Sequence, residues 1–430
     1  MTTLFSIAIA LFAGLMLSRP AKKLGMPAVT AYLIAGILIG PYCLGQIGVE
    51  GLGFITHDSV TALSMFSEVA LGFIAFAIGN EFRLAQLRAI GRQATVVAIF
   101  QALMATVLVD AALIALHFVL GEDKLPLTAC IMLGAVATAT APAATLMVVR
   151  QYKAKGPVTD ILLPVVALDD AVGLIVFAIS FGVARAIAEG AFSIVGILVE
   201  PLIEIVASLA LGALMGYLFN WCEQYFHSNS RRTSMSVTFV ILTVAISMLE
   251  FEVAGIHIGF SSLLVCMMLG TIFCNICDFS AELMDRVDGW TTPLFVLFFV
   301  LSGAELELSV FSDLAVVGIG VVYIIFRSLG KYFGAGISAR AVHCPDTIVK
   351  YLGITLLPQA GVALGMSMKA LALPGGAGEL VRNVTLFSVL IYELVGPLAT
   401  KKALMAAGEI DPEGRVSNRG KSPKKKHHHK

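Results

Sequence analysis

Apolar runs of 18 residues or more recur along almost the whole 430-residue chain. A run of that length, wound as a helix, is long enough to cross a hydrocarbon core of about 30 Å. The composition agrees, because 58% of the residues are hydrophobic and only 13% are charged, against about 25% charged in soluble domains. The sequence therefore predicts an all-α polytopic membrane protein.

Glycine, proline or charged residues divide the apolar sequence into thirteen spans. The spans fall at residues 3–18, 27–45, 59–80, 93–119, 126–149, 157–187, 192–222, 235–250, 254–276, 289–304, 310–339, 347–373 and 377–404. They predict a transmembrane domain over residues 1–405 and a short, basic, disordered cytoplasmic tail over 406–430. The first span has no basic segment before it and no small-residue cleavage site, which favours a retained helix over a signal peptide.

Lysine and arginine are distributed unevenly between the loops. Of the 29, 23 lie in the tail, in loops after odd-numbered spans or at the ends of spans beside them, and three lie in or beside loops after even-numbered spans. Positive loops are retained in the cytoplasm during insertion. We therefore expect a multi-pass protein of the plasma (inner) cell membrane, with its N-terminus outside and its C-terminus in the cytoplasm.

Two spans contain a proline where an intact helix would not tolerate it well. Pro142 lies in Thr138-Ala139-Thr140-Ala141-Pro142, and Pro358 lies in Leu357-Pro358-Gln359-Ala360-Gly361. Proline removes a main-chain donor and clashes with the preceding turn. If the chain is divided into six spans, one linker and six spans, both prolines fall in the fifth span of a half. This placement predicts two inverted-topology repeats with broken crossing helices, the pattern of a secondary transporter with a site at the midplane.

Asp169 and Asp170 stand side by side within an apolar span, about thirteen residues from its cytoplasmic end. A charged side chain at mid-bilayer costs at least about 2.5–3.5 kcal/mol, so such acids usually face a cavity or a partner and have a function. Adjacent helical residues point about 100° apart. One carboxylate can therefore face a cavity while the other reaches a neighbouring helix.

Arg327 and Lys331 are candidate partners for this acidic pair. They lie one helical turn apart on the same face of a later span. The depth of Arg327 matches that of the aspartates, whereas Lys331 is one turn shallower. Two interpretations of Lys331 stay open, an ion pair with Asp169 or a side chain that reaches the inner interface.

Other polar features of the sequence are weaker. Single polar residues in apolar context favour helix packing or an interface position over function; they are Glu68, Asp110, His117, Glu204, His257 and Glu393. Cys274-X-X-Cys277 has no second cysteine or histidine pair, which disfavours a zinc site. No Walker motif occurs, and Gly375-Gly376-Ala377-Gly378 lacks a strand before it. We expect no cofactor, no nucleotide domain, no nucleic-acid partner and no enzymatic activity.

Six short motifs carry a resemblance to a known family. They are Pro27 to Pro41, Ser67-Glu68-Val69-Ala70-Leu71 through Gly79-Asn80-Glu81, Thr138-Ala139-Thr140-Ala141-Pro142, Asp169-Asp170, Arg327-X-X-Gly330-Lys331 and Leu357-Pro358-Gln359-Ala360-Gly361-Val362. In their order and spacing, over about residues 1–405, the chain resembles the monovalent cation/proton antiporter superfamily. The branch is that of the sodium/proton antiporters, which is related to the transmembrane part of potassium-efflux antiporters.

The resemblance implies a homodimer with a mobile core and alternating access. Core helices would lie around residues 93–187 and 310–404, and the remaining helices would form the dimer contact and scaffold. It also implies that Asp170 binds the ion and that Asp169 pairs with a basic residue, with Thr138 and Thr140 as further ion- and proton-binding residues. Potassium-efflux relatives usually carry Gln-Asp in place of Asp169-Asp170 and add a nucleotide-binding domain, so both departures favour Na⁺/H⁺ exchange.

Competition for the same oxygens supplies a mechanism. A proton and Na⁺, a hard cation that prefers oxygen ligands, cannot both occupy Asp170, so loading one expels the other. The half-helix ends at Thr140 and Gln359 would add partial charges and freed carbonyls. The second carboxylate, Asp169, favours electrogenic exchange of Na⁺, or of Li⁺. A K⁺/H⁺ antiporter stays open as the alternative, and an ion channel or a membrane sensor is favoured less.

Overall fold

The computed structural model describes residues 2–24, 26–49, 53–80, 83–189, 200–226, 228–249, 251–253, 256–306, 308–373 and 376–410. These residues are nearly all helical, as the sequence predicts. The α-helices are α1 (Thr2–Lys23), α2 (Ala28–Ile39), α3 (His57–Thr61), α4 (Ser64–Asn80), α5 (Leu84–Leu120), α6 (Leu127–Val136), α7 (Pro142–Gln151), α8 (Pro157–Glu189), α9 (Glu200–Glu223), α10 (Asn229–Ser247), α11 (Ser262–Ile276), α12 (Ser280–Glu305), α13 (Leu314–Ala341), α14 (Asp346–Thr355), α15 (Gly361–Ala370) and α16 (Ala377–Ala406).

Short irregular elements connect some of the helices. Two are 3₁₀ turns, η1 (Leu44–Ile47) and η3 (Leu308–Ser312). Two short strands, β1 (Phe251–Val253) and β2 (Ile256–Ile258), pair antiparallel with Phe251 opposite Ile258. This pair precedes α11, so the helix begins eight residues later than the span predicted from residue 254.

Most predicted spans coincide with one helix over the greater part of their length, and two coincide with a pair of half-helices. The spans at 126–149 and 347–373 are the divided ones, as α6 with α7 and α14 with α15. Within the described residues, seven helices are long and apolar enough to cross a membrane, by length and composition, and four shorter apolar helices accompany them. The number of thirteen crossings stays a prediction. The predicted tail lies outside the described residues from 411 onward.

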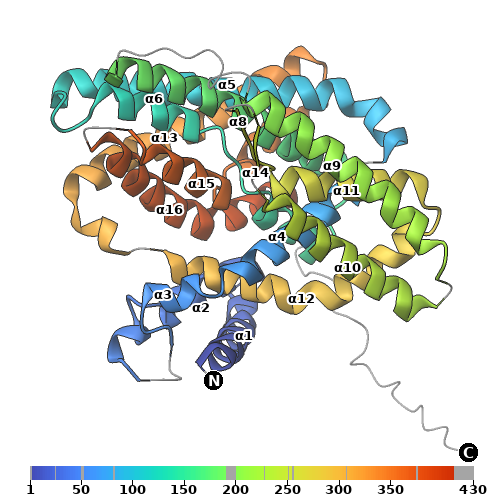
Figure 1. Ribbon diagram of the computed structural model, residues 1–430. Helices are drawn as coiled ribbons and strands as arrows, with labels where there is room; N and C mark the ends of the chain where they lie inside the picture. The colour runs from blue at the N-terminus through green and yellow to red at the C-terminus, as the bar shows by residue number, and fades with distance from the viewer. Residues whose placement is uncertain are drawn as a thin grey trace, which may run out of the picture.

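The buried side chains form two main apolar clusters. The first cluster draws on α1, α2, α4, α7 and α9–α12. The second cluster draws on α5, α6, α13, α15 and α16. In Figure 1 the helices of the first cluster occupy the lower and right-hand parts of the molecule, and α5, α6, α13, α15 and α16 occupy the upper and left-hand parts. α6 and α7, the halves of one broken helix, therefore pack into different clusters.

Helix α8 passes from one cluster to the other. Leu163 and Ala167 belong to the first cluster, and Phe177 and Ala184 belong to the second. The aspartate pair lies between these two stretches of the helix. The fold thus places it at the junction of the clusters.

Small residues allow α2 and α12 to pack closely within the first cluster. A β-carbon on Gly36 would lie 2.0 Å from the carbonyl oxygen of Val300, and one on Gly303 would lie 2.2 Å from that of Leu33. No side chain fits at either position. Such close backbone contacts are typical of helix packing in lipid, where dispersion replaces the hydrophobic effect.

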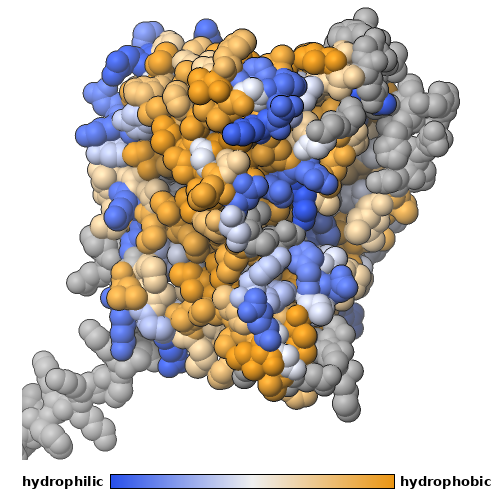
Figure 2. Space-filling view, turned by 90° about the vertical axis from the view of Figure 1, so that its left-hand side faces the viewer, coloured by the Kyte–Doolittle hydropathy of each residue, from blue (hydrophilic) through white to orange (hydrophobic). Residues whose placement is uncertain are grey.

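Large apolar side chains cover much of the outside. On α1 they include Leu4 and Phe12, exposed by 76% and 66%, and on α5 they include Phe118, exposed by 80%. Figure 2 shows broad hydrophobic areas on one face, interrupted by separate hydrophilic patches. Contiguous apolar surface of this kind is unfavourable in water and is stable against lipid.

Candidate functional site

Two interrupted helices cross at the centre of the site. The first break covers residues 137–141, between α6 and α7, and the second covers 356–360, between α14 and α15. Pro142 is the first residue of α7, and Pro358 lies within the second break. The main-chain N–H of Ala141 donates to the carbonyl of Pro358 at 2.8 Å, so the two breaks touch directly.

Arg327 of α13 holds both breaks in place. Its side chain is fully buried. Nε donates to the carbonyl of Ala137 at 3.1 Å and Nη1 to that of Leu357 at 2.8 Å, and Nη2 donates to Ala139. These are carbonyls that an unbroken helix would satisfy itself, and in a dry interior each needs another donor. The unwound chain is therefore stabilised by a side chain from a distant helix.

Gln359 supplies a second link between the breaks. Its Nε2 donates to the carbonyl of Val136 at 3.0 Å and to the hydroxyl of Tyr323 at 2.9 Å. Its Oε1 accepts from Ser388 of α16 at 3.5 Å. The predicted broken-helix residues thus all lie where the two interrupted helices cross; they are Pro142, Pro358 and Gln359.

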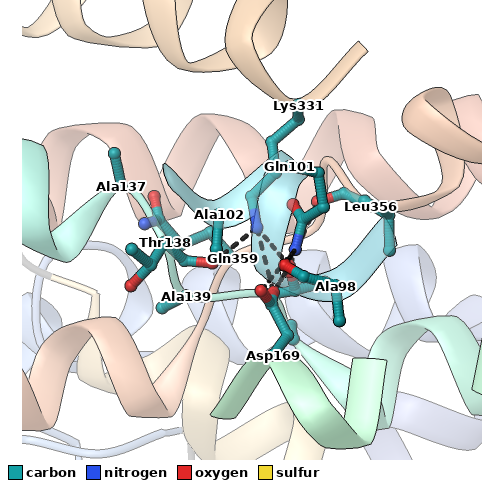
Figure 3. Close-up of polar contacts among 12 residues, drawn as sticks. Ala98, Gln101, Ala102, Ala137, Thr138, Ala139, Asp169, Lys331, Leu356 and Gln359 are labelled. Carbon is teal, nitrogen blue, oxygen red and sulfur yellow. Dashed lines mark hydrogen bonds and ion pairs between the residues drawn. The ribbon is translucent and has the colours of Figure 1, made fainter. Parts of the chain in front are cut away.

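The carboxylate of Asp169 is the polar centre of the site. It is fully buried and forms an ion pair with Lys331, whose Nζ lies 2.9 Å from Oδ2. The hydroxyl of Thr140 also donates to Oδ2, and the amide Nε2 of Gln101 donates to Oδ1. Figure 3 shows Gln101 and Lys331 pointing toward Asp169 from two different helices. Three donors thus surround the Asp169 carboxylate.

Lys331 is bound on several sides as well. Its ammonium donates to the hydroxyl of Thr140 at 2.9 Å and to the carbonyl of Thr138. Since Lys331 is fully buried, its side chain does not reach the inner interface. Of the two basic residues left open by the sequence, the structure therefore pairs Lys331 with Asp169. The described hydrogen bonds of Arg327 go to main-chain carbonyls instead.

Asp170 has very different surroundings, although it is the next residue. It is 3% exposed, and both carboxylate oxygens are buried without a hydrogen-bond partner among the described residues. Burying an ionised carboxylate without partners is very costly. An arrangement of this kind is stable when the carboxyl group carries a proton or when a cation lies against it.

Oxygen ligands for such a cation lie close to α8. At Gly173, one turn beyond Asp170, an added β-carbon would lie 2.9 Å from the hydroxyl oxygen of Thr138. The missing side chain therefore lets α8 approach the first break. Hydroxyl, carbonyl and carboxylate oxygens are the ligands that hard cations prefer. Among the described residues, no cluster of three or more His, Cys, Asp or Glu side chains could hold a metal ion.

The weaker sequence candidates do not join this site. His117 contacts the carbonyl of Leu125 at 2.7 Å and lies 3.6 Å from Glu122, at the end of α5. Asp110 packs against Gly134 of α6. The side chain of His257 lies outside the described residues. Cys274 and Cys277 form no disulfide within the described part of the chain, and the thiol of Cys274 donates to the carbonyl of Thr271 at 3.3 Å.

Two residues with buried polar contacts are not predicted from the sequence, Gln101 beside Asp169 and Glu409 at the start of α8. Gln101 is a single amide in an apolar run, a pattern that resembles a packing residue. Glu409 is 250 residues from Thr159, which it contacts. No local pattern links either residue to its contact.

Comparison with known proteins places the chain among transporters. It is 22% identical over 410 residues to the Na⁺/H⁺ antiporter NhaS5 of Synechocystis, covering 93% of this chain and 54% of that protein. It is 21% identical over 408 residues to the K⁺/H⁺ antiporter subunit KhtU of Bacillus subtilis, covering 93% of each. It is 23% identical over 381 residues to the cation/H⁺ antiporter 19 of Arabidopsis thaliana, covering 86% of this chain and 45% of that protein.

The fold has a solved counterpart. The sodium proton antiporter MjNhaP1 of Methanocaldococcus jannaschii, determined at pH 8, superposes with a TM-score of 0.68 at 16% identity. The match covers 95% of this chain and 98% of that one. The family model described as sodium/hydrogen exchanger, transmembrane, matches residues 7–406. Because that match takes in nearly the whole chain, the chain belongs to this family of membrane cation/proton antiporters.

Proposed function

We propose that the chain is a secondary antiporter that exchanges Na⁺ for protons by alternating access, with Asp170 as the shared carrier. The observation that carries the proposal is the contrast within the aspartate pair. Asp170 is buried with no donor among the described residues, while Asp169 beside it accepts from an ammonium, a hydroxyl and an amide. A buried carboxylate without hydrogen-bond donors takes up one cation or one proton.

Exchange follows from exclusive occupancy of Asp170. Its oxygens bind either a proton or a cation, because the two compete for the same lone pairs. Thr138 and Thr140 lie at the break beside the aspartates and supply oxygen atoms to that side of the site. No separate coupling device is needed, because release of one ion permits binding of the other.

Asp169 and Lys331 give the cycle a second titratable unit. If a cation near Asp170 disturbs this ion pair, the pair releases a proton in addition to the one displaced from Asp170. Two protons then move against one Na⁺, and the exchange carries net charge. Li⁺ is a further substrate because it shares the preference of Na⁺ for hard oxygen ligands.

K⁺/H⁺ exchange is the second candidate for the same site. It is supported by the similarity to a K⁺/H⁺ antiporter subunit, of whose length the chain spans 93%. The Asp169-Asp170 doublet favours Na⁺, as the resemblance described above implies. Both candidates use the same carrier residue and differ in the size of the cation that the oxygens accept.

The membrane arrangement belongs to the same proposal. We place the protein in the plasma membrane as a homodimer, with the N-terminus outside and the C-terminus in the cytoplasm. The core helices would be those around residues 93–187 and 310–404, which move relative to the dimer and scaffold helices. The helices outside these ranges, α1, α2, α4 and α9–α12, meet in one apolar cluster, which supports their role as the scaffold.

Proton flux in proteoliposomes tests the proposal. Addition of Na⁺, Li⁺ or K⁺ to liposomes with a preformed pH gradient should dissipate it, with Na⁺ and Li⁺ more effective than K⁺. Asp170→Asn should abolish the response, and Asp123→Asn in an exposed loop serves as the matched control. If Asp170→Asn exchanges ions at the wild-type rate, Asp170 is not the carrier. If K⁺ dissipates the pH gradient more effectively than Na⁺, the protein is a K⁺/H⁺ antiporter.

A further inference from the structure

Glu393 of α16 is a buried acid that the exchange site does not use. Its side chain is 5% exposed, and its Oε2 is buried without a hydrogen-bond partner among the described residues. A neutral carboxyl group that served only for packing would donate its proton to an acceptor. An ionised one would need a positive partner. Packing alone therefore does not account for an acid at this position.

Two further acids are linked electrostatically to Glu393, one after the other. Glu305, the last residue of α12, acts on Glu393, and Glu68, one turn into α4, acts on Glu305. Glu68 and Glu305 are partly buried. Among the described residues, no ion pair joins any of the three to a basic side chain. Carboxylates that approach one another in this way repel unless positive charge is supplied to them.

The two inner acids lie on the boundary between the two apolar clusters. Beside Glu305, Ala304 belongs to the first cluster and Leu306 belongs to the second. Leu394, the residue after Glu393, packs against both clusters. The aspartate pair of α8 lies at the junction of the same clusters. The acids are therefore on the surface where the scaffold meets the helices of the site.

Helix α16 connects this boundary to the broken helices. One turn beyond Glu393, a β-carbon on Gly396 would lie 3.0 Å from the Cα of Pro358, which belongs to the second break. At the other end of the series, Glu68 and Glu305 lie near the start of α4 and at the end of α12. In the predicted orientation both of these helix ends are on the outer side. The acids thus lead from that side toward the crossing of the breaks.

We propose that Glu68, Glu305 and Glu393 form a carboxylate path for monovalent cations between the outer side and the broken helices, with Glu393 as its inner binding residue. The inference rests on the proposed function, because the path delivers Na⁺ to the carrier Asp170 and releases it from there. Carboxylate oxygens are ligands that hard cations prefer. Low-dielectric walls lined by one sign of charge also concentrate the opposite ion, by about tenfold or more.

A series of weak binding positions suits this role better than one tight site. In the described part of the chain, no three acidic, histidine or cysteine side chains converge to hold a metal ion. A transported ion must bind well enough to enter and weakly enough to leave. Carboxylates placed one after another on different helices meet both conditions.

The first test removes the charge of the inner residue and keeps its shape. In proteoliposomes, Glu393→Gln should raise the KM for Na⁺ about tenfold and leave kcat within about twofold, because cation delivery weakens while the carrier is unchanged. Glu379→Gln is the matched control, since Glu379 is an exposed acid at the start of the same helix. An unchanged KM in Glu393→Gln overturns the inference. So does a fall in kcat at constant KM, which would place Glu393 in the moving carrier instead.

A labelling experiment tests the path independently of the transport rate. In a cysteine-free background, Glu393→Cys and the control Glu379→Cys are treated from the outer side with a cationic and with an anionic methanethiosulfonate reagent. The ratio of the cationic to the anionic rate should be about tenfold higher at Glu393→Cys, and adding Glu305→Gln should lower it. Equal ratios at the two positions, or reaction of Glu393→Cys from the inner side alone, overturn the inference. Failure of the proposed function is separate, because it appears as exchange by Asp170→Asn.

Discussion

Two neighbouring carboxylates of α8 have opposite environments, and this difference arises from helix geometry. Successive residues point about 100° apart, so Asp169 faces α5, α13 and the first break, while Asp170 faces none of their donors. A buried charge is tolerated when a partner and hydrogen bonds surround it. Asp169 meets that condition within the protein, and Asp170 meets it only through a proton or a cation.

The ion pair between Lys331 and Asp169 predicts a stability effect. Lys331→Met leaves a buried carboxylate without its charge partner, which costs about 3–5 kcal/mol. The variant should therefore lose thermal stability in detergent. The double variant Asp169→Asn with Lys331→Met removes both charges and should regain most of the stability. A double variant as unstable as the single one would contradict this account.

At the scale of elements, the breaks depend on donors supplied by other helices. Pro142 and Pro358 were predicted to interrupt their helices, and they do. Pro164, Pro293 and Pro397 lie inside continuous helices. The difference is tertiary, because Arg327, Lys331 and Gln359 bind the carbonyls freed at the two breaks. The sequence shows at which prolines a helix can be interrupted. Donors from other helices, mainly α13, determine at which of them it is interrupted.

The difference between local sequence signals and tertiary contacts also explains which site residues could be predicted from the sequence. Asp169, Asp170 and Lys331 are ionisable groups in apolar spans, and the energetic cost of that placement marks them as functional candidates. Gln101 carries no charge, so its cost is small and its pattern is that of any packing residue. The choice between Arg327 and Lys331 needed three-dimensional contacts, because both lie on one face of one helix.

Helix α8 has a cap supplied by Glu409, three residues after the end of α16, which predicts a second stability effect. Glu409 accepts from the main-chain N–H groups of Val158 and Thr159 at 2.6 and 2.8 Å, and from the hydroxyl of Thr159 at 2.6 Å. A carboxylate at a helix N-terminus satisfies free donors and opposes the helix dipole. Glu409→Ala should therefore destabilise the protein by about 1–2 kcal/mol in thermal unfolding. Glu379→Ala, at an exposed position, should have a smaller effect, and equal effects would argue against the cap.

At the scale of the whole molecule, the site lies where two apolar clusters meet. The first break separates α6 in one cluster from α7 in the other, and α8 passes between the same clusters at the aspartates. Arg327 and Lys331 join the breaks to α13, so these segments are bound to one another by polar contacts. The alternating access that we propose would move these segments together relative to the scaffold helices, and so would change which side of the membrane Asp170 faces. The family match supports a cation/proton antiporter.

Charge movement is the property of the whole cycle that the aspartate pair predicts. If both Asp170 and the Asp169–Lys331 pair release a proton for each Na⁺ bound, one net charge crosses the membrane per cycle. Moving one charge through 100 mV is worth about 2.3 kcal/mol, enough to bias the exchange about fiftyfold. Na⁺-driven proton flux should therefore change with a membrane potential clamped by K⁺ and valinomycin in liposomes. A flux and a reversal point that ignore the potential would mean one-for-one exchange, with Asp169 and Lys331 confined to holding the breaks and α8 together.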